Sequence, residues 1–163
     1  VDNAHSNVGF TVKHMMVTNV HGKFTSYDAK VEFDDATKTF KKLVANIDTN
    51  SIDTGIEKRD NHLRSDDFFA VEKFPKMTFE MTSYKADGDD GKMTGNLTIR
   101  GITKPVVLEV EDISVLGDKV GFSVEGKINR QDFDLKWNKA IELGGVAVSD
   151  EVKIKVDIEA KKQ

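Results

Sequence analysis

Histidines and carboxylates are the side chains that could carry chemistry in this sequence, because it contains no cysteine. The lack of cysteine excludes a disulfide framework, a cysteine-ligated metal and a thiol nucleophile. The four histidines form no His-x-His or His-x-x-x-His pair, so the sequence predicts neither a metal site nor a cofactor. They are His5, His14, His21 and His62.

His14 has the most informative position of the four. It shares the parity of Phe10 and Val12, so it should point inward at the end of a strand. A hydrogen-bonded histidine at the rim of a β-structure is the favoured interpretation, ahead of a metal ligand or a catalytic base.

Catalytic and phosphate-binding motifs are absent from the sequence. There is no Gly-x-Ser-x-Gly, and the adjacent His5 and Ser6 would point to opposite faces of a strand. No Gly-rich phosphate loop occurs, and the paired carboxylates Asp66-Asp67 and Asp89-Asp90 lie in turn-like segments. We therefore expect no enzymatic activity, and a cofactor-free enzyme that uses His14 is a less favoured alternative.

The composition indicates one domain over residues 1–163. Hydrophobic residues make up 38% and charged residues 32% of the 163 residues, as in an ordinary globular domain. The net charge is −4 and the basic residues are spread along the chain, which argues against nucleic acid or an anionic membrane surface as partner. No stretch reaches the roughly 18 to 20 apolar residues of a membrane span, so we expect a chain that does not span the membrane.

Alternation with period 2 is the main structural signal. In residues 151–159 every even residue is branched and apolar, and every odd residue is charged. The same pattern recurs around residues 8–12, 43–47, 77–81, 97–99, 106–110 and 120–124. An eighth strand covers about 20–33, where a change of parity near Ser26 predicts a bulge or bend. Turn residues such as Gly117-Asp118 and Gly144-Gly145 separate the strands.

The segment 51–75 is the exception to this pattern. Thr54 and Glu57 have the spacing of a capping box, which predicts a short helix through about Arg64, between the third and fourth strands. A cluster of bulky apolar residues follows and should cover one end of the sheet: Phe68, Phe69, Val71 and Phe74. Short connections elsewhere favour antiparallel neighbours, and periodicity alone leaves a closed barrel and a two-sheet sandwich open.

Two basic-polar patches remain, 58–64 with Arg59 and 129–133 with Arg130. A solvated surface with local ion pairs explains either patch. A polar mouth that receives the head group of an amphiphile explains them equally well.

Several ordered motifs along nearly the whole chain resemble the YceI-like family of polyisoprenoid-binding proteins. These are Asp2-Asn3-Ala4-His5-Ser6 with Lys13-His14, Ser51-Ile52-Asp53-Thr54-Gly55 with Lys58-Arg59-Asp60, Asp67-Phe68-Phe69, Gly101-Ile102-Thr103-Lys104-Pro105, Asn129-Arg130 with Asp132-Phe133, and Trp137-Asn138. Asp134 departs from the family pattern, which has glycine there. If that position takes a positive φ, aspartate tolerates it better than most residues but at some cost.

The resemblance implies an all-β fold, an eight-stranded antiparallel lipocalin-like β-barrel, and thereby favours barrel over sandwich. It implies a lumen that holds a long isoprenoid or quinone-like lipid. The ligand-binding candidates are the inward and lid residues together with the two mouth arginines: Phe10, Val12, His14, Phe24, Ile47, Arg59, Phe68, Phe69, Phe74, Phe79, Met81, Leu97, Ile99, Phe122, Arg130 and Trp137.

The expected function is to carry or store such a lipid, and the alternative is a structural or adaptor barrel with a filled core. The family's usual export implies a periplasmic or secreted protein whose signal peptide has been removed, with the cytoplasm as the other possibility. A homodimer is a further hypothesis, because carriers with large mouths often hide them by dimerising.

Overall fold

The computed structural model describes residues 1–138 and 148–162 of the chain. Its strands are β1 (Asn7–His14), β2 (Thr18–Phe24), β3 (Tyr27–Asp34), β4 (Thr39–Asp48), β5 (Ile52–Asp53), β6 (Lys76–Asp87), β7 (Asp90–Ile99), β8 (Ile102–Leu116), β9 (Lys119–Asn129) and β10 (Val148–Lys161). One α-helix, α1 (Glu57–Arg64), and the 3-10 turns η1 (Asn3–His5), η2 (Thr49–Ser51) and η3 (Arg130–Phe133) complete the described part. The predicted turn at Gly144-Gly145 lies outside the described residues.

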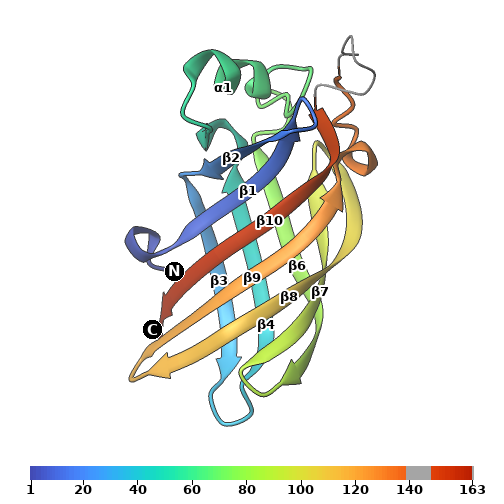
Figure 1. The fold of residues 1–163 in the computed structure, drawn as a ribbon. Helices are drawn as coiled ribbons and strands as arrows, with labels where there is room; N and C mark the ends of the chain where they lie inside the picture. The colour runs from blue at the N-terminus through green and yellow to red at the C-terminus, as the bar shows by residue number, and fades with distance from the viewer. Residues whose placement is uncertain (139–147, 163) are drawn as a thin grey trace.

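The strands form a single curled sheet with α1 at one end (Figure 1). The strand order is β3-β4-β6-β7-β8-β9-β10-β1-β2-β5, and each described pair is antiparallel. β2 and β3 are consecutive in the chain, so the bend at Thr25 and Ser26 joins β3, at one end of this order, to β2, which is next to the other end. The amide of Asp48 donates to the Ser26 carbonyl at 2.9 Å and holds the bend against β4.

The predicted all-β antiparallel architecture is confirmed, but the strand count of eight is wrong. The described residues form ten strands, because the segment predicted as one strand over 20–33 is divided into β2 and β3, and because β5 adds a tenth. The break falls at Thr25 and Ser26, where the parity of the apolar residues changes. β5 has only two residues, too few for any periodicity to show.

The short helix lies where the sequence predicted it and ends at Arg64, but its start is different. Ile56 is the N-cap residue and makes no side-chain capping bond, so the predicted capping box is wrong. The Thr54 amide and hydroxyl instead donate to the carboxylate of Asp60, at 2.9 and 2.5 Å. Asp60 is buried, and it satisfies the polar groups of the loop that enters the helix.

Aromatic side chains close the end of the barrel opposite α1. Phe40 is 2% exposed, and its ring centroid lies 4.8 Å from that of Phe122 and 5.1 Å from that of Tyr84. Phe33 packs on the same ring at 4.9 Å. This end is therefore filled by packed rings.

Glycines in the wall let two phenylalanine rings lie flat against it. Phe10 on β1 is directly opposite Gly22 on β2, and a β-carbon at Gly22 would lie only 2.3 Å from Cζ of Phe10. Gly95 on β7 is covered in the same way by Phe79, at 2.4 Å. A ring that covers a glycine occupies the space of the missing side chain, so less of the ring projects into the barrel.

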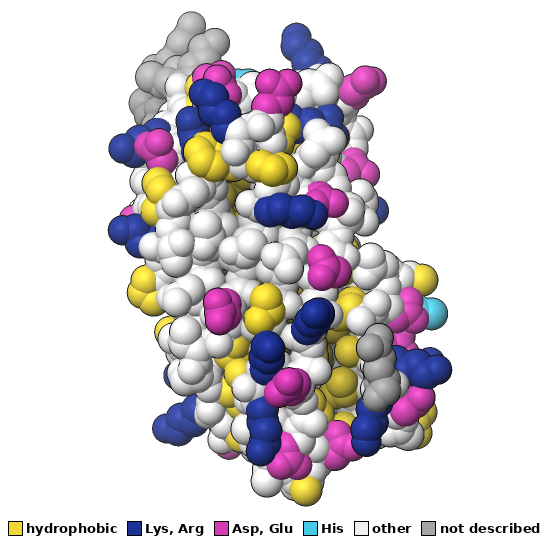
Figure 2. Space-filling view, turned by 180° about the vertical axis from the view of Figure 1, so that it is seen from behind, with side chains coloured by type: hydrophobic (Ala, Val, Ile, Leu, Met, Phe, Trp, Pro, Cys, Tyr) yellow, Lys and Arg dark blue, Asp and Glu magenta, His cyan; other side chains and the backbone are white. Residues whose placement is uncertain are grey.

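The face of the barrel seen in Figure 2 is mixed in charge, with apolar side chains visible between the charged ones. Figure 2 shows lysine, arginine, aspartate and glutamate side chains interspersed over one face of the barrel, without a patch of a single sign. Within the described residues, no helix combines the length and the apolar character needed to cross a bilayer.

Candidate ligand-binding site

The interior of the barrel contains a cavity of about 210 Å³. Side chains from all the long strands and from the α1 region line it, and nearly all of them are apolar. The alternation seen in the sequence produces this lining, because every second residue of each strand faces inward. The volume is below the roughly 300 to 1,000 Å³ usual for small-molecule sites, which suits one narrow chain better than a bulky ring system.

The segment that follows α1 covers the open end of the cavity. Phe68 and Phe69 line the cavity together with Leu63 of the helix. The Phe69 ring meets Phe24 edge-on at 5.8 Å, and Phe24 lies 5.8 Å from Phe10 in the wall. The prediction that this segment covers one end of the barrel is thus confirmed, since Leu63, Phe68 and Phe69 line the cavity there.

Three rings meet where this lid joins η3. The imidazole of His62 packs edge-on against Trp137 at 4.8 Å and against Phe68 at 5.1 Å. His62 is also fixed from the solvent side, since its Nε2 lies 2.9 Å from Oδ2 of Asp67. We call His62, Phe68 and Trp137 the mouth cluster. It combines an apolar inner side with a polar outer edge.

Arg130 is a buried cation beside the cavity, with 3% of the residue exposed. Its Nε donates to the Ser149 carbonyl at 2.8 Å and its Nη2 to the Val148 carbonyl at 3.1 Å. Its Nη1 donates to the carbonyls of Leu135 and Trp137. All three nitrogens are therefore used to tie the loop after η3 to the start of β10.

Burial lowers the pKa of Arg130, and Asp150, whose Oδ1 lies 3.8 Å from Nη2, raises it by a smaller amount. The four carbonyl oxygens and the Asp150 carboxylate compensate the positive charge at the edge of the cavity. Arg59 has no comparable position. Its Nε and Nη2 donate to the hydroxyl and carbonyl of Thr54, both at 2.7 Å, so it stabilises the loop before α1.

Eleven of the sixteen predicted ligand-binding residues line the cavity. They are Phe10, Val12, Phe24, Ile47, Phe68, Phe69, Phe79, Leu97, Ile99, Phe122 and Arg130. Outside the lining are His14, Arg59, Phe74, Met81 and Trp137. Trp137 belongs to the mouth cluster, Met81 is half-buried and packs on the core, and Phe74 covers Gly101 in the turn between β7 and β8.

His14 is exposed and does not line the cavity. The ladder between β1 and β2 stays regular through His14, and the change of register between β1 and β10 places the extra residues on β10. His14 therefore keeps the parity of Phe10 and Val12, but it lies at the end of β1, outside the lined part of the lumen.

The prediction omitted much of the cavity wall. Val152, Ile154, Val156 and Ile158 of β10 line it, although their alternation is the clearest in the chain. Leu43, Met77, Met93, Leu108 and Val124 also belong to it. The alternation identified these positions as inward-facing, but it gave no means of distinguishing a cavity wall from a filled core.

Asp134 adopts the left-handed conformation that the sequence comparison suggested. Its φ is 60° and its ψ is 22°, where it ends η3. Its carbonyl accepts a hydrogen bond from Nη1 of Arg100 at 3.2 Å, and Arg100 also donates to the Phe68 carbonyl at 3.1 Å. Arg100 thus joins the η3 loop to the lid.

Comparison with known proteins agrees with this architecture. A family model described as the YceI-like domain matches residues 1–160. The chain belongs to the YceI-like family. Protein YceI of Salmonella newport is 38% identical over 164 aligned residues, which cover 98% of this chain and 83% of that protein.

Solved structures of the family superpose over almost the whole chain. BcnA of Burkholderia cenocepacia has a TM-score of 0.88 at 28% identity, and the match covers 99% of each chain. The YCEI protein of Campylobacter jejuni has a TM-score of 0.82 at 42% identity, over 100% of this chain and 96% of that one. A polyisoprenoid binding domain from Saccharophagus degradans shares the fold, with a TM-score of 0.66 at 17% identity over 97% and 94% of the two chains.

Proposed function

We propose that this YceI-like chain binds one long, narrow lipid in its lumen and carries or stores it. The apolar cavity of about 210 Å³ supports this proposal, because an apolar lining of this kind favours a hydrocarbon chain over water. Each buried CH₂ group of such a chain contributes about 0.8 kcal/mol.

The two ends of the cavity differ in polarity, and this difference would fix the orientation of a bound lipid. Packed rings around Phe40 close one end, so the tail would stop there. The mouth cluster and the Arg130 cation lie at the other end, where a polar or anionic head group would be placed. Half-buried rings such as Phe10 and Phe69 give the lumen room to widen around a thicker chain.

An isoprenoid or a quinone-like lipid is the ligand class that we propose. The Saccharophagus degradans domain is named for binding polyisoprenoid. It shares only 17% of its sequence with this chain, so its name serves to choose the test lipids, and the proposal rests on the apolar cavity. The alternative is an adaptor with a filled core, which the dense packing around Phe40 favours at one end of the barrel.

A filling substitution tests the proposal. Ala45 lines the cavity, so Ala45→Phe should fill part of the lumen and weaken binding of a polyprenol by about tenfold or more. Ala86→Phe is the matched control, because Ala86 is exposed on β6 and should leave binding unchanged. Binding that is equal in both variants, or absent from the wild type after delipidation and reloading, would contradict a lumenal site.

A further inference from the structure

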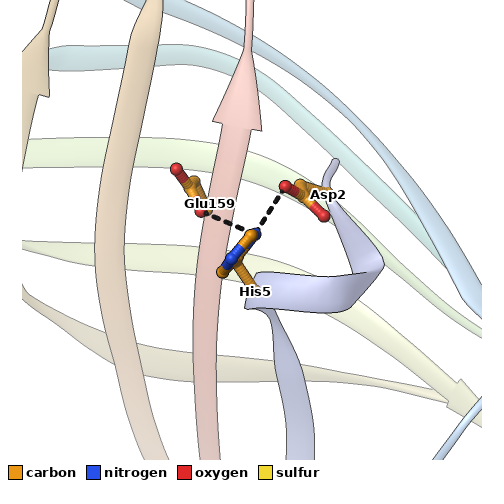
Figure 3. A group of neighbouring side chains, drawn as sticks. All are labelled: Asp2, His5 and Glu159. Carbon is orange, nitrogen blue, oxygen red and sulfur yellow. Dashed lines mark hydrogen bonds and ion pairs between the residues drawn. The ribbon is translucent and has the colours of Figure 1, made fainter.

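A histidine and two carboxylates meet on the outside of the barrel, away from the lipid cavity (Figure 3). Asp2 and His5 belong to the N-terminal turn, and Glu159 projects from β10. Nδ1 of His5 lies 2.8 Å from Oδ2 of Asp2 and 3.4 Å from Oε2 of Glu159. The three donor atoms all lie within 4.8 Å of one another.

Backbone hydrogen bonds hold the two segments together. The amide of Asp2 donates to the Glu159 carbonyl at 2.8 Å, and the amide of Glu159 donates to Oγ of Ser6 at 3.1 Å. Within the turn, the His5 amide donates to the Asp2 carbonyl at 3.2 Å. The Cα positions of all three residues are thereby fixed without any contribution from their side chains.

Each carboxylate is also oriented by its second oxygen. Oδ1 of Asp2 accepts a hydrogen bond from the Ala4 amide at 2.9 Å, which leaves Oδ2 directed at His5. Oε1 of Glu159 lies 3.5 Å from Nζ of Lys119, which leaves Oε2 directed at the same imidazole nitrogen. Outer partners of this kind orient the carboxylate ligands of metal sites.

The donors lie close to the spacing that a tetrahedral metal ion requires. Bond lengths of roughly 2.0 to 2.2 Å place the ligand atoms of tetrahedral zinc roughly 3.3 to 3.6 Å apart. The distance from His5 to Glu159 already lies in this range, and that from His5 to Asp2 needs to lengthen by at least about half an ångström. One imidazole nitrogen and two carboxylate oxygens form a donor set that suits Zn²⁺, and their two negative charges balance the ion.

We propose that Asp2, His5 and Glu159 bind a divalent transition-metal ion of the zinc class through Oδ2, Nδ1 and Oε2. Exposure of His5 leaves room for water in the fourth position. The ion would fasten the N-terminal turn to β10. An ordinary surface ion pair would need only two of these groups and would contribute little to stability.

Titration calorimetry with zinc ion alone, on untagged full chain, tests this proposal. The wild type should bind one zinc per chain, and His5→Ala, Asp2→Asn and Glu159→Gln should each weaken binding at least about tenfold. Asn and Gln keep the hydrogen bonds of the second oxygens. His21→Ala is the matched control, since His21 is another exposed histidine, and its Nδ1 lies 2.9 Å from Oγ1 of Thr11.

Cobalt ion gives a second readout, because it develops visible absorption when it is held tetrahedrally. Thermal melts verify that each variant is folded, and His5→Asn replaces His5→Ala if the latter is not. Three results would overturn the site: no stoichiometric zinc in the wild type, equal affinity in His5→Ala and wild type, or equal losses in His5→Ala and His21→Ala. Loss in His5→Ala with full binding in both carboxylate variants would also reject it.

Discussion

Replacing Gly22 with alanine should narrow the lumen by moving one ring. The three atoms nearest to the new β-carbon all belong to the Phe10 ring, at 2.3, 2.6 and 2.9 Å. Ordinary van der Waals contact begins at 3.4 Å, so the ring has to move by about 1.1 Å. Phe10 borders the cavity, and the free direction for this movement is into the lumen.

The effects of Gly22→Ala on stability and on binding can be estimated separately. Overpacking costs about 1–3 kcal/mol, and replacing a strand glycine recovers about 0.5–1 kcal/mol, so the free energy of unfolding should fall by at most about 2.5 kcal/mol. If the displaced ring excludes two CH₂ groups of the ligand, binding loses about 1.6 kcal/mol, slightly more than tenfold. Gly22→Ala should thus fold and bind lipid poorly.

The assay compares polyprenol affinity and urea unfolding in a small set of variants. Gly121→Ala is the matched control, because the nearest atom to its β-carbon is the Ile158 carbonyl oxygen at a comfortable 3.8 Å. Adding Phe10→Leu to Gly22→Ala should restore part of the affinity. Unchanged affinity in Gly22→Ala would show that the ligand does not pass the Phe10 ring. A loss of stability above about 3 kcal/mol would show that the lumen has no room for the displaced ring.

Three further predictions concern the residues that support the site. Arg130→Lys should lower the free energy of unfolding by about 3 kcal/mol in urea titrations, because an ammonium group cannot serve four carbonyls, and a loss below about 1 kcal/mol would contradict the clamp. Asp134→Gly should raise the stability by up to about 1 kcal/mol in the same assay, since glycine accepts a φ of 60° without strain; a destabilised variant would refute this reasoning. Hydrogen bonds from Lys76 and then Ser26 lower the pKa of Asp48, so this carboxylate stabilises the fold above its unfolded pKa of about 3.9, and the contribution is lost as the pH falls through its lower folded value. Thermal melts of Asp48→Asn should therefore show a shallower loss of stability than the wild type below about pH 4, and parallel curves would count against it.

The sequence contained most of the information about the walls and little about the ends of the barrel. Alternation in β10 is complete over Val152, Ile154, Val156 and Ile158, and each of these residues faces the cavity. His14 has the same parity as Phe10 and Val12, but it is exposed at the end of β1 and lies outside the lining. Local periodicity indicates the face of a residue, and it does not show how far along the strand the cavity extends.

The roles of the arginines could not be predicted from their types. Arg59 and Arg130 both belong to basic-polar patches, yet Arg59 bonds to Thr54, and Arg130 bonds to four carbonyls in the loop after η3 and at the start of β10. These two segments are not adjacent in the sequence, so the clamp forms only when the fold brings them together. The cavity could not be predicted from the sequence either, because its shape depends on ring orientations such as that of Phe10 over Gly22.

Native mass spectrometry of the purified chain, followed by organic extraction and mass analysis of the released molecule, tests the lumenal lipid most directly. We expect one discrete long-chain lipid per chain in the wild type. An added polyprenol should displace this lipid, and Ala45→Phe should lack it. A clean mass without adduct, under conditions that preserve lipid complexes and after incubation with polyprenol, would contradict a lipid carrier and favour an adaptor with a filled core.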